Sequence, residues 1–456
     1  MTGDAQDNEI KIEFTGVVGQ YKITGNGTTV NGSPFVTFNG VTNDFNIKMG
    51  NGNDAVSLFA NGALHFPIHG DLSIDSGNGD NVVFMQTDNT SQILIDGDVS
   101  VKAKGGSDNV LIKANGAGST VSIAGNLKTT LGPGSNSLVL QSFANGSAIL
   151  ISGTTTYTGK NGNDILLLQA GGTTSRVEPT GDMFVKAGGG DNSFFMQAQN
   201  TSSKVFAHNN VSYKGTSGQD IVGLQATALN SFVEIGTDLK VSLGSKDNSF
   251  AMQANGDSSF VRVDQSVSVT ATSGMDNVGM QANDSSSSVT VQHDLSVKLG
   301  GGTNSTFFQA NGNTASILLN GNTSITTGSG TDNFGIQAND TNAKVLLGGT
   351  LDVKLGGGDN SAAAISNAAG ALVRFSGDAT FTGGNGEDVF FFQRNAGNLI
   401  RFLSDVNVNM LGGDDSFFYK GLDVDGLAIF NGGPGTDMLL DGGGNSFSTP
   451  PTIISF

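Results

Sequence analysis

The chain has 456 residues, with 40 acidic and 22 basic side chains, a formal net charge of −18, 68 glycines and no cysteine. The acidic balance argues against nucleic acid or an anionic membrane surface as a partner, and it suits divalent cations. The lack of cysteine excludes disulfides and thiolate metal sites, and no apolar run approaches the ~18 residues of a membrane span.

The first part of the chain is the least regular. Its start, MTGDAQDNEI, has no basic segment followed by an apolar core, so no signal peptide is visible in this chain. The runs IKIEF, QYKI and FVTF alternate like short strands between Gly and Asn turns. We therefore expect a β cap over residues 1–43.

One turn-and-strand unit then recurs, as in GSGTDNFGIQAN at 328–339, where a glycine-rich turn precedes an Asp or Asn and an alternating strand. From Asp108 to Asp388 the Asp or Asn recurs every 28 residues. A fixed period of this length is typical of a solenoid, in which each repeat buries its apolar face by stacking on its neighbours. The recurring residues are Asp54, Asn81, Asp108, Asn136, Asp164, Asn192, Asp220, Asn248, Asp276, Asn304, Asp332, Asn360, Asp388 and Asp415.

Each period holds three short alternating runs, such as LKVSL, SFAMQA and FVRV within 238–265. Three half-buried strands per period predict an all-β protein, a three-faced parallel β-helix over residues 44–431. About fourteen turns at roughly 4.8 Å would form a rod on the order of 70 Å long. Residues 432–456 are expected to form a last turn and a Gly/Ser/Pro-rich tail. The inward residues predicted for 238–265 are Leu239, Val241, Leu243, Phe250, Met252, Ala254, Val261 and Val263.

Successive repeats alternate in type, which indicates a 56-residue double unit. VKAGGGDNSFFMQA at 185–198 carries Asn at the recurring position, and YKGTSGQDIVGLQA at 213–226 carries Asp. Carboxylates stacked ~4.8 Å apart would repel by roughly 3.5 kcal/mol at an effective dielectric of 20, and interposed amides relieve this repulsion. Duplication of a 56-residue unit would give the same alternation, so both explanations stand.

The turns GGNGEDVFF at 383–391 and GGPGTDMLL at 432–440 match the pattern G-G-x-G-x-D-x-apolar-x. In this they resemble the calcium-binding nonapeptides of the RTX, or hemolysin-type, family, and the resemblance implies calcium held by Asp carboxylates in a secreted protein. RTX nonapeptides follow one another every nine residues, whereas here one occurs per 28. Tight solenoid corners also favour Gly and Asp, so structural corners are the alternative. The candidate metal ligands are Asp54, Asp80, Asp164, Asp191, Asp220, Asp247, Asp276, Asp332, Asp359, Asp388 and Asp437.

Two further columns are expected to point away from the core. A column of Gln can form hydrogen-bonded amide ladders, and beside it a column with scattered Phe forms either an association surface or packing beneath a neighbouring turn. The candidate interaction face consists of Phe195, Phe307, Phe391, Phe418, Gln197, Gln225, Gln253, Gln281, Gln309 and Gln337.

The sequence shows no arrangement of residues typical of a catalytic site. The fold expected here resembles the pectin-lyase-like β-helices, which implies cleavage of acidic polysaccharides, but the carboxylates are periodic and the Arg residues scatter. We expect no enzyme but a structural or adhesive rod at a bacterial cell surface: a self-associating filament, sheath or surface-layer subunit, or an adhesin stalk. The expected partners are other copies of the chain, end to end or laterally, with a surface glycan as a further candidate. The alternatives are a secreted calcium-binding RTX-like protein and a polysaccharide lyase or hydrolase.

Overall fold

The computed structural model describes residues 1–62, 65–395 and 397–456. The described residues form strands and turns without a helix, which confirms the predicted all-β class. Three parallel sheets stack as a β-solenoid of about 13 turns with roughly 28 residues per turn, against the fourteen turns expected. The chain divides into two compact units: unit 1 comprises Met1–Ile221 and Ser231–Gly236, and unit 2 comprises Val222–Asn230 and Thr237–Phe456.

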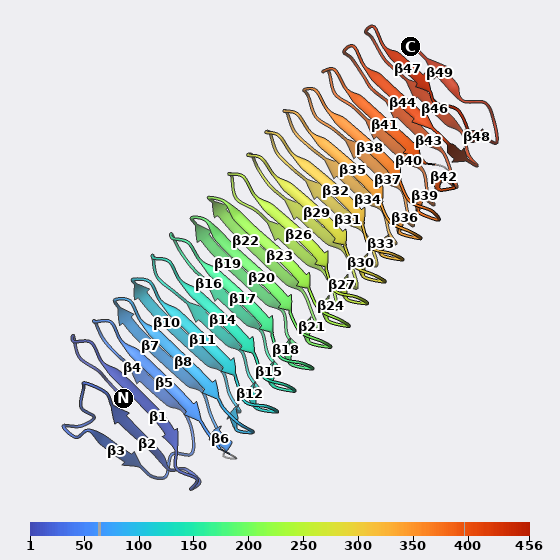
Figure 1. Cartoon of the computed structure of the whole chain (residues 1–456). Coiled ribbons are helices and arrows are strands. Elements are labelled where there is room, and N and C mark those ends of the chain that lie inside the picture. Colours follow the sequence, from blue (N-terminus) through green and yellow to red (C-terminus); the bar gives the residue numbers. More distant parts are fainter. Residues whose placement is uncertain (63–64, 396) are drawn as a thin grey trace. The chain divides into compact units, whose positions relative to one another are not determined.

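In unit 1 each turn contributes one strand to each of three sheets, and the strands lie turn upon turn in Figure 1. Sheet 1 contains β4 (Phe45–Lys48), β7 (Leu72–Asn78), β10 (Val99–Gly105), β13 (Leu127–Thr130), β16 (Thr155–Thr158), β19 (Met183–Gly189) and β22 (Val211–Ser217). Sheet 2 contains β1 (Glu9–Phe14), β5 (Ala55–Ala60), β8 (Val82–Thr87), β11 (Asn109–Ala114), β14 (Ser137–Ser142), β17 (Ile165–Ala170) and β20 (Asn192–Ala198). Sheet 3 contains β6 (His65–Ile68), β9 (Gln92–Ile95), β12 (Thr120–Ile123), β15 (Ala148–Ile151), β18 (Arg176–Pro179), β21 (Lys204–Ala207) and β24 (Phe232–Ile235).

Unit 2 repeats the same order of sheets, and β23 (Asp220–Ala226) contains the residue at which unit 1 gives way to unit 2 in the sequence. Its sheet 1 contains β25 (Leu239–Ser242), β28 (Val267–Thr270), β31 (Leu295–Lys298), β34 (Thr323–Thr326), β37 (Leu351–Lys354), β40 (Ala379–Thr382), β43 (Val406–Asn409), β46 (Ala428–Asn431) and β49 (Thr452–Ile454). Its sheet 2 contains β26 (Ser249–Ala254), β29 (Asn277–Ala282), β32 (Ser305–Ala310), β35 (Asn333–Ala338), β38 (Ser361–Ser366), β41 (Val389–Arg394), β44 (Ser416–Lys420) and β47 (Met438–Asp441). Its sheet 3 contains β27 (Phe260–Val263), β30 (Ser288–Val291), β33 (Ser316–Leu319), β36 (Lys344–Leu347), β39 (Leu372–Phe375), β42 (Leu399–Phe402), β45 (Leu422–Val424) and β48 (Ser446–Phe447).

The core consists of columns of apolar side chains, because strict pairing places the same position of each turn above its predecessor. In sheet 1 of unit 2, for example, Leu239 pairs with Val267 and Val241 with Val269. All eight inward residues predicted for 238–265 are buried, with exposures of 4% or less. Burying each such Val, Leu or Phe contributes roughly 1.5–3 kcal/mol, so the stacking of turns supplies most of the stability.

The N-terminal end of unit 1 is closed by antiparallel strands. β1 pairs in parallel with β5 and antiparallel with β2 (Tyr21–Gly25), and β2 pairs antiparallel with β3 (Phe35–Phe38). The Tyr21 ring packs against Phe45 and Phe66 at centroid distances of 4.8 and 5.5 Å, which covers the first turn of the core. The division into a cap at 1–43, repeats at 44–431 and a tail at 432–456 stays a prediction.

Close approach of successive turns explains the glycines at the corner between sheets 1 and 2. Gly330 has φ +134°, and a Cβ there would lie 2.1 Å from the carbonyl oxygen of Gly302 one turn earlier. Any larger residue would therefore push the turns apart. This corner brings each recurring Asp or Asn to the start of its sheet 2 strand.

Candidate functional site

The recurring Asp and Asn residues form a buried ladder at the corner between sheets 1 and 2. Asn304 is representative: its Nδ2 donates to Asp332 Oδ1 at 2.8 Å, and its backbone N–H donates to the same oxygen at 3.1 Å. The Asp276 backbone N–H donates to Asn304 Oδ1 at 3.3 Å. The same links run from Asp54 to Asp220 in unit 1 and from Asn248 to Asp437 in unit 2. The Oδ1 atom of each of these side chains thus accepts a hydrogen bond from a backbone N–H of the preceding turn.

Burial shapes the electrostatics of this ladder. Desolvation raises the pKa of Asp164 to about 6, although hydrogen bonds from Asn136 oppose the shift. Desolvation likewise raises the pKa of Asp276, and the nearby Asp247 carboxylate adds to that rise. Among the described residues, the Oδ2 atoms of Asp54, Asp108, Asp276, Asp332, Asp415 and Asp437 are buried and accept no hydrogen bond. The Tyr157 hydroxyl lies against the Asp164 carboxylate and lowers the pKa of that group.

The alternation of Asp and Asn stops at the last turns of unit 2, where Asp388, Asp415 and Asp437 follow one another. The Asp388 backbone N–H donates to Asp415 Oδ1 at 2.8 Å, and the Asp415 backbone N–H donates to Asp437 Oδ1 at 2.9 Å. Desolvation, followed by the charges of Asp388, Asp437 and Asp414, raises the pKa of Asp415 to about 6. This end of the ladder lacks the amides that separate the carboxylates elsewhere.

The structure places the candidate metal ligands in two separate columns. Asp54, Asp164, Asp220, Asp276, Asp332 and Asp388 belong to the buried ladder and are at most 2% exposed. Asp80, Asp191, Asp247 and Asp359 precede ladder residues and are exposed, and Asp437 is half-buried. The Oδ1 atoms of those four exposed residues each accept a backbone N–H of the next turn at 2.7 to 3.0 Å. Within the described parts of the chain, no group of three or more His, Asp or Glu side chains is placed to hold a metal ion.

Another side-chain ladder, which was not predicted from the sequence, lies at the corner between sheets 3 and 1. The Asp71 backbone N–H donates to Asp44 Oδ1 at 2.9 Å, and the Asp98 backbone N–H donates to Asp71 Oδ1 at 2.7 Å. The pattern continues in unit 2, where Asn322 donates to Asp294 Oδ1 at 2.9 Å. Gly-Asp or Gly-Asn pairs recur before several sheet 1 strands, as at 70–71, 97–98, 125–126, 181–182, 321–322 and 377–378, and they were the signal for this ladder.

The predicted Gln column lies on the outward face of sheet 2, and its amides are hydrogen-bonded from turn to turn. In unit 1 Gln141 Nε2 donates to Gln169 Oε1 at 2.7 Å, and that chain of amides reaches Gln197. In unit 2 the ladder runs through Gln225, Gln253, Gln281, Gln309 and Gln337 at 2.8 to 3.0 Å. A parallel ladder of Asn255, Asn283, Asn311, Asn339 and Asn367 flanks it at 2.6 to 2.7 Å.

The predicted Phe column also lies on the outward face of sheet 2. Phe307 is half-buried over Gly279, where an added Cβ would lie 2.4 Å from its ring. Phe391 and Phe418 stack at a centroid distance of 5.0 Å. In unit 1 the column continues upstream of Phe195 through Leu167, Val139, Leu111 and Phe84, which our sequence analysis did not include.

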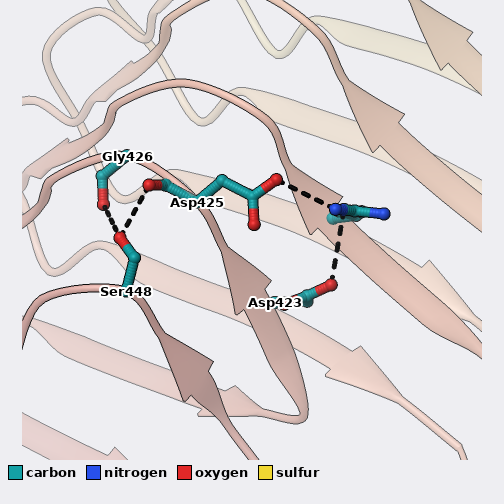
Figure 2. Close-up of polar contacts among 5 residues, drawn as sticks. Asp423, Asp425, Gly426 and Ser448 are labelled. Carbon is teal, nitrogen blue, oxygen red and sulfur yellow. Dashed lines mark hydrogen bonds and ion pairs between the residues drawn. The ribbon is translucent and has the colours of Figure 1, made fainter.

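Partly exposed ion pairs lie on the outward face of sheet 3. Arg401 Nε lies 3.4 Å from Asp423 Oδ2, and its Nη2 lies 3.0 Å from Asp425 Oδ2. Figure 2 shows these two carboxylates at the corner after β45. Ser448 of the last turn donates to the carbonyl oxygens of Asp425 and Gly426 at 2.6 and 3.3 Å. The three charged side chains of this cluster are 27–45% exposed. Such pairs contribute little stability, and they lie on a sheet face that leaves them open to water.

No protein-family model, curated protein or solved structure matches the chain. In the described residues no helix is long and apolar enough to cross a membrane.

Proposed function

We propose that this protein is a structural element that assembles with other copies of itself, such as a subunit of a filament or sheath at a bacterial cell surface. The observation that carries the proposal is the repetition of the side-chain ladders over most turns of each unit. Functional clefts interrupt a repeat with residues that serve chemistry instead of stacking, whereas here the carboxylates and amides serve the neighbouring turn. The proposed role is mechanical, because the solenoid presents a regular surface that repeats at the constant spacing of its turns.

Sedimentation velocity on the purified chain tests the proposal, because a monomer has a mass of 46.5 kDa. We expect species of at least twice that mass, and we expect the fraction of protein in these species to increase as the protein concentration rises from 1 to 100 µM. A monomer throughout this range, with and without millimolar calcium, would refute self-assembly.

Calcium binding in the manner of RTX turns is the second candidate function. The buried Oδ2 atoms of Asp108, Asp276 and Asp332, which accept no hydrogen bond among the described residues, favour it. Calcium prefers six to eight oxygen ligands, which the turns would have to supply from carboxylates and backbone carbonyls. Thermal melts in EDTA and in calcium separate this candidate from the first.

A further inference from the structure

The outward face of sheet 2 in unit 1 carries an apolar column whose residue types read the same in both directions. The strands β8, β11, β14, β17 and β20 pair in register, so that one outward position of each strand lies beside the next. The residues at this position, in order, are Phe84, Leu111, Val139, Leu167 and Phe195. All five side chains are half-buried, and the exposed Val82 and Ile165 beside them widen the apolar area. We call this surface, over β8 to β20, the palindromic face.

The palindromic face carries almost no charge in a chain whose net charge is −18. Its outward positions contain no carboxylate, and its one charged side chain is Lys113, whose Nζ lies 5.8 Å from the centroid of the Phe84 ring. The outward face of sheet 1 in the same unit differs, since it presents Lys102, Lys128, Lys186 and Lys214. A sheet face with an apolar central column, uncharged polar neighbours and a single charge is typical of a protein–protein contact.

We propose that a second copy of this chain docks on the palindromic face, with a two-fold axis parallel to β14. The inference rests on the self-assembly proposed above and names the surface of one lateral contact within it. The axis reverses the order of turns, so Val139 meets the partner's Val139 and Leu111 meets the partner's Leu167. It also sets Lys113 opposite the partner's Gln169, which avoids contact between like charges. A column that reads the same in both directions suits an isologous contact.

The size and spacing of the face fit a second copy. Five strands at ~4.8 Å and six residues at ~3.3 Å cover roughly 500 Å² per copy, or roughly 1,000 Å² for the pair. That area reaches the lower limit for a specific protein interface. Because both copies repeat at the spacing of one solenoid turn, side chains of one sheet can interdigitate with those of the other at every turn, as in stacked sheets.

Matched lysine substitutions test the location of the contact. Leu167→Lys puts a charge in the centre of the palindromic face, and Leu150→Lys makes the same change on the outward face of β15 in sheet 3. We expect Leu167→Lys to weaken self-association at least tenfold in sedimentation velocity and Leu150→Lys to leave it within twofold. Equal association of the two variants would overturn the proposed surface while leaving self-assembly intact.

A charge pair tests the two-fold axis itself. Leu111→Glu alone and Leu167→Lys alone should each weaken association, and the double variant should recover it, because the axis brings each new charge against its opposite. Because the chain has no cysteine, Val139→Cys provides a second readout. A short bis-maleimide should link that variant into dimers, and Thr156→Cys on the outward face of β16 should stay unlinked. A double variant as weak as either single variant, or equal cross-linking at both cysteines, would overturn the arrangement. A wild type that stays monomeric would refute the proposed function itself.

Discussion

Asn304→Asp would place three buried carboxylates in succession, because Asn304 lies between Asp276 and Asp332 in the ladder. All three side chains are 0% exposed. The change removes an Nδ2 group that donates to Asp332 Oδ1 at 2.8 Å and to the Gly300 carbonyl oxygen at 3.0 Å. It replaces a donor by an acceptor and adds a charge where water cannot screen it.

The expected loss follows from the spacing of the turns. At ~4.8 Å each neighbouring carboxylate repels the new one by roughly 3.5 kcal/mol at an effective dielectric of 20. Binding a proton avoids this repulsion, and protonating a carboxyl group of ordinary pKa ~3.9 at pH 7 costs about 4 kcal/mol. We therefore expect the free energy of unfolding to fall by about 4 kcal/mol at pH 7. The loss should shrink by about 1.4 kcal/mol for each pH unit down to 5, because the folded state binds the proton more tightly than the unfolded state.

Urea unfolding followed by circular dichroism at pH 5, 6 and 7 measures this loss against the wild type. Thr303→Asp is the matched control, since Thr303 precedes Asn304 but its side chain is exposed. That control should change the free energy of unfolding by less than about 0.5 kcal/mol. Equal destabilisation of Asn304→Asp at pH 5 and pH 7, or an equal loss in Thr303→Asp, would contradict repulsion between buried carboxylates as the cause.

Three further outcomes are expected. Asp415→Asn should stabilise the chain at pH 7.5 and flatten the pH dependence of its stability. The folded-state pKa of Asp415 is raised to about 6, so the stability that the Asp415 carboxyl contributes is complete below pH 4 and is lost as pH rises through 6. Melting temperatures from pH 4 to 8 measure this difference, and identical curves for variant and wild type would contradict it. Gly118→Ala should lower the free energy of unfolding by about 1 kcal/mol, and Gly118→Asn should lower it by less than half of that. Gly118 has φ +68° with open space around it, and Asn adopts the equivalent conformation at Asn230 and Asn342. Equal losses for the two variants in urea unfolding would refute this explanation. Millimolar calcium should shift the melting temperature by less than about 1 °C relative to EDTA, since the ladder carboxylates already accept backbone hydrogen bonds, and a large upward shift would instead establish the calcium-binding candidate.

The period and the core were predictable because every turn must fill the same interior positions. A 28-residue repeat with three alternating runs leaves one register in which residues such as Leu239 and Phe250 all face inward, and both are buried. The Gln ladder followed from the same alternation. These features depend on the order of residues along the strand, which the sequence states directly.

Side-chain direction at the corners was not predictable in the same way. Asp80 and Asn81 are neighbours in sequence, yet Asp80 is exposed whereas Asn81 is 1% exposed. The backbone dihedrals of the turn decide which side chain turns inward, and a glycine-rich turn allows several choices. Listing Asp164 and Asp191 together as candidate metal ligands therefore overlooked that the two belong to different columns. The apolar column from Phe84 to Phe195 was overlooked for a different reason: Leu and Val at an outward position read as ordinary strand residues until their stacking is seen.

The ladders bear on function because they separate the stability of the fold from the chemistry of its surface. Stacked turns are stabilised by the interior columns and by corner side chains such as Asp164 and Asn192, so the outward positions are left free to vary. On sheet 1 of unit 1 they do vary, between Lys102, Thr130 and Thr158. Across five turns of sheet 2, by contrast, the outward column stays apolar without contributing to the buried core. Exposing such a column to water gains nothing for an isolated molecule, and burying it against a second flat sheet stabilises an assembly.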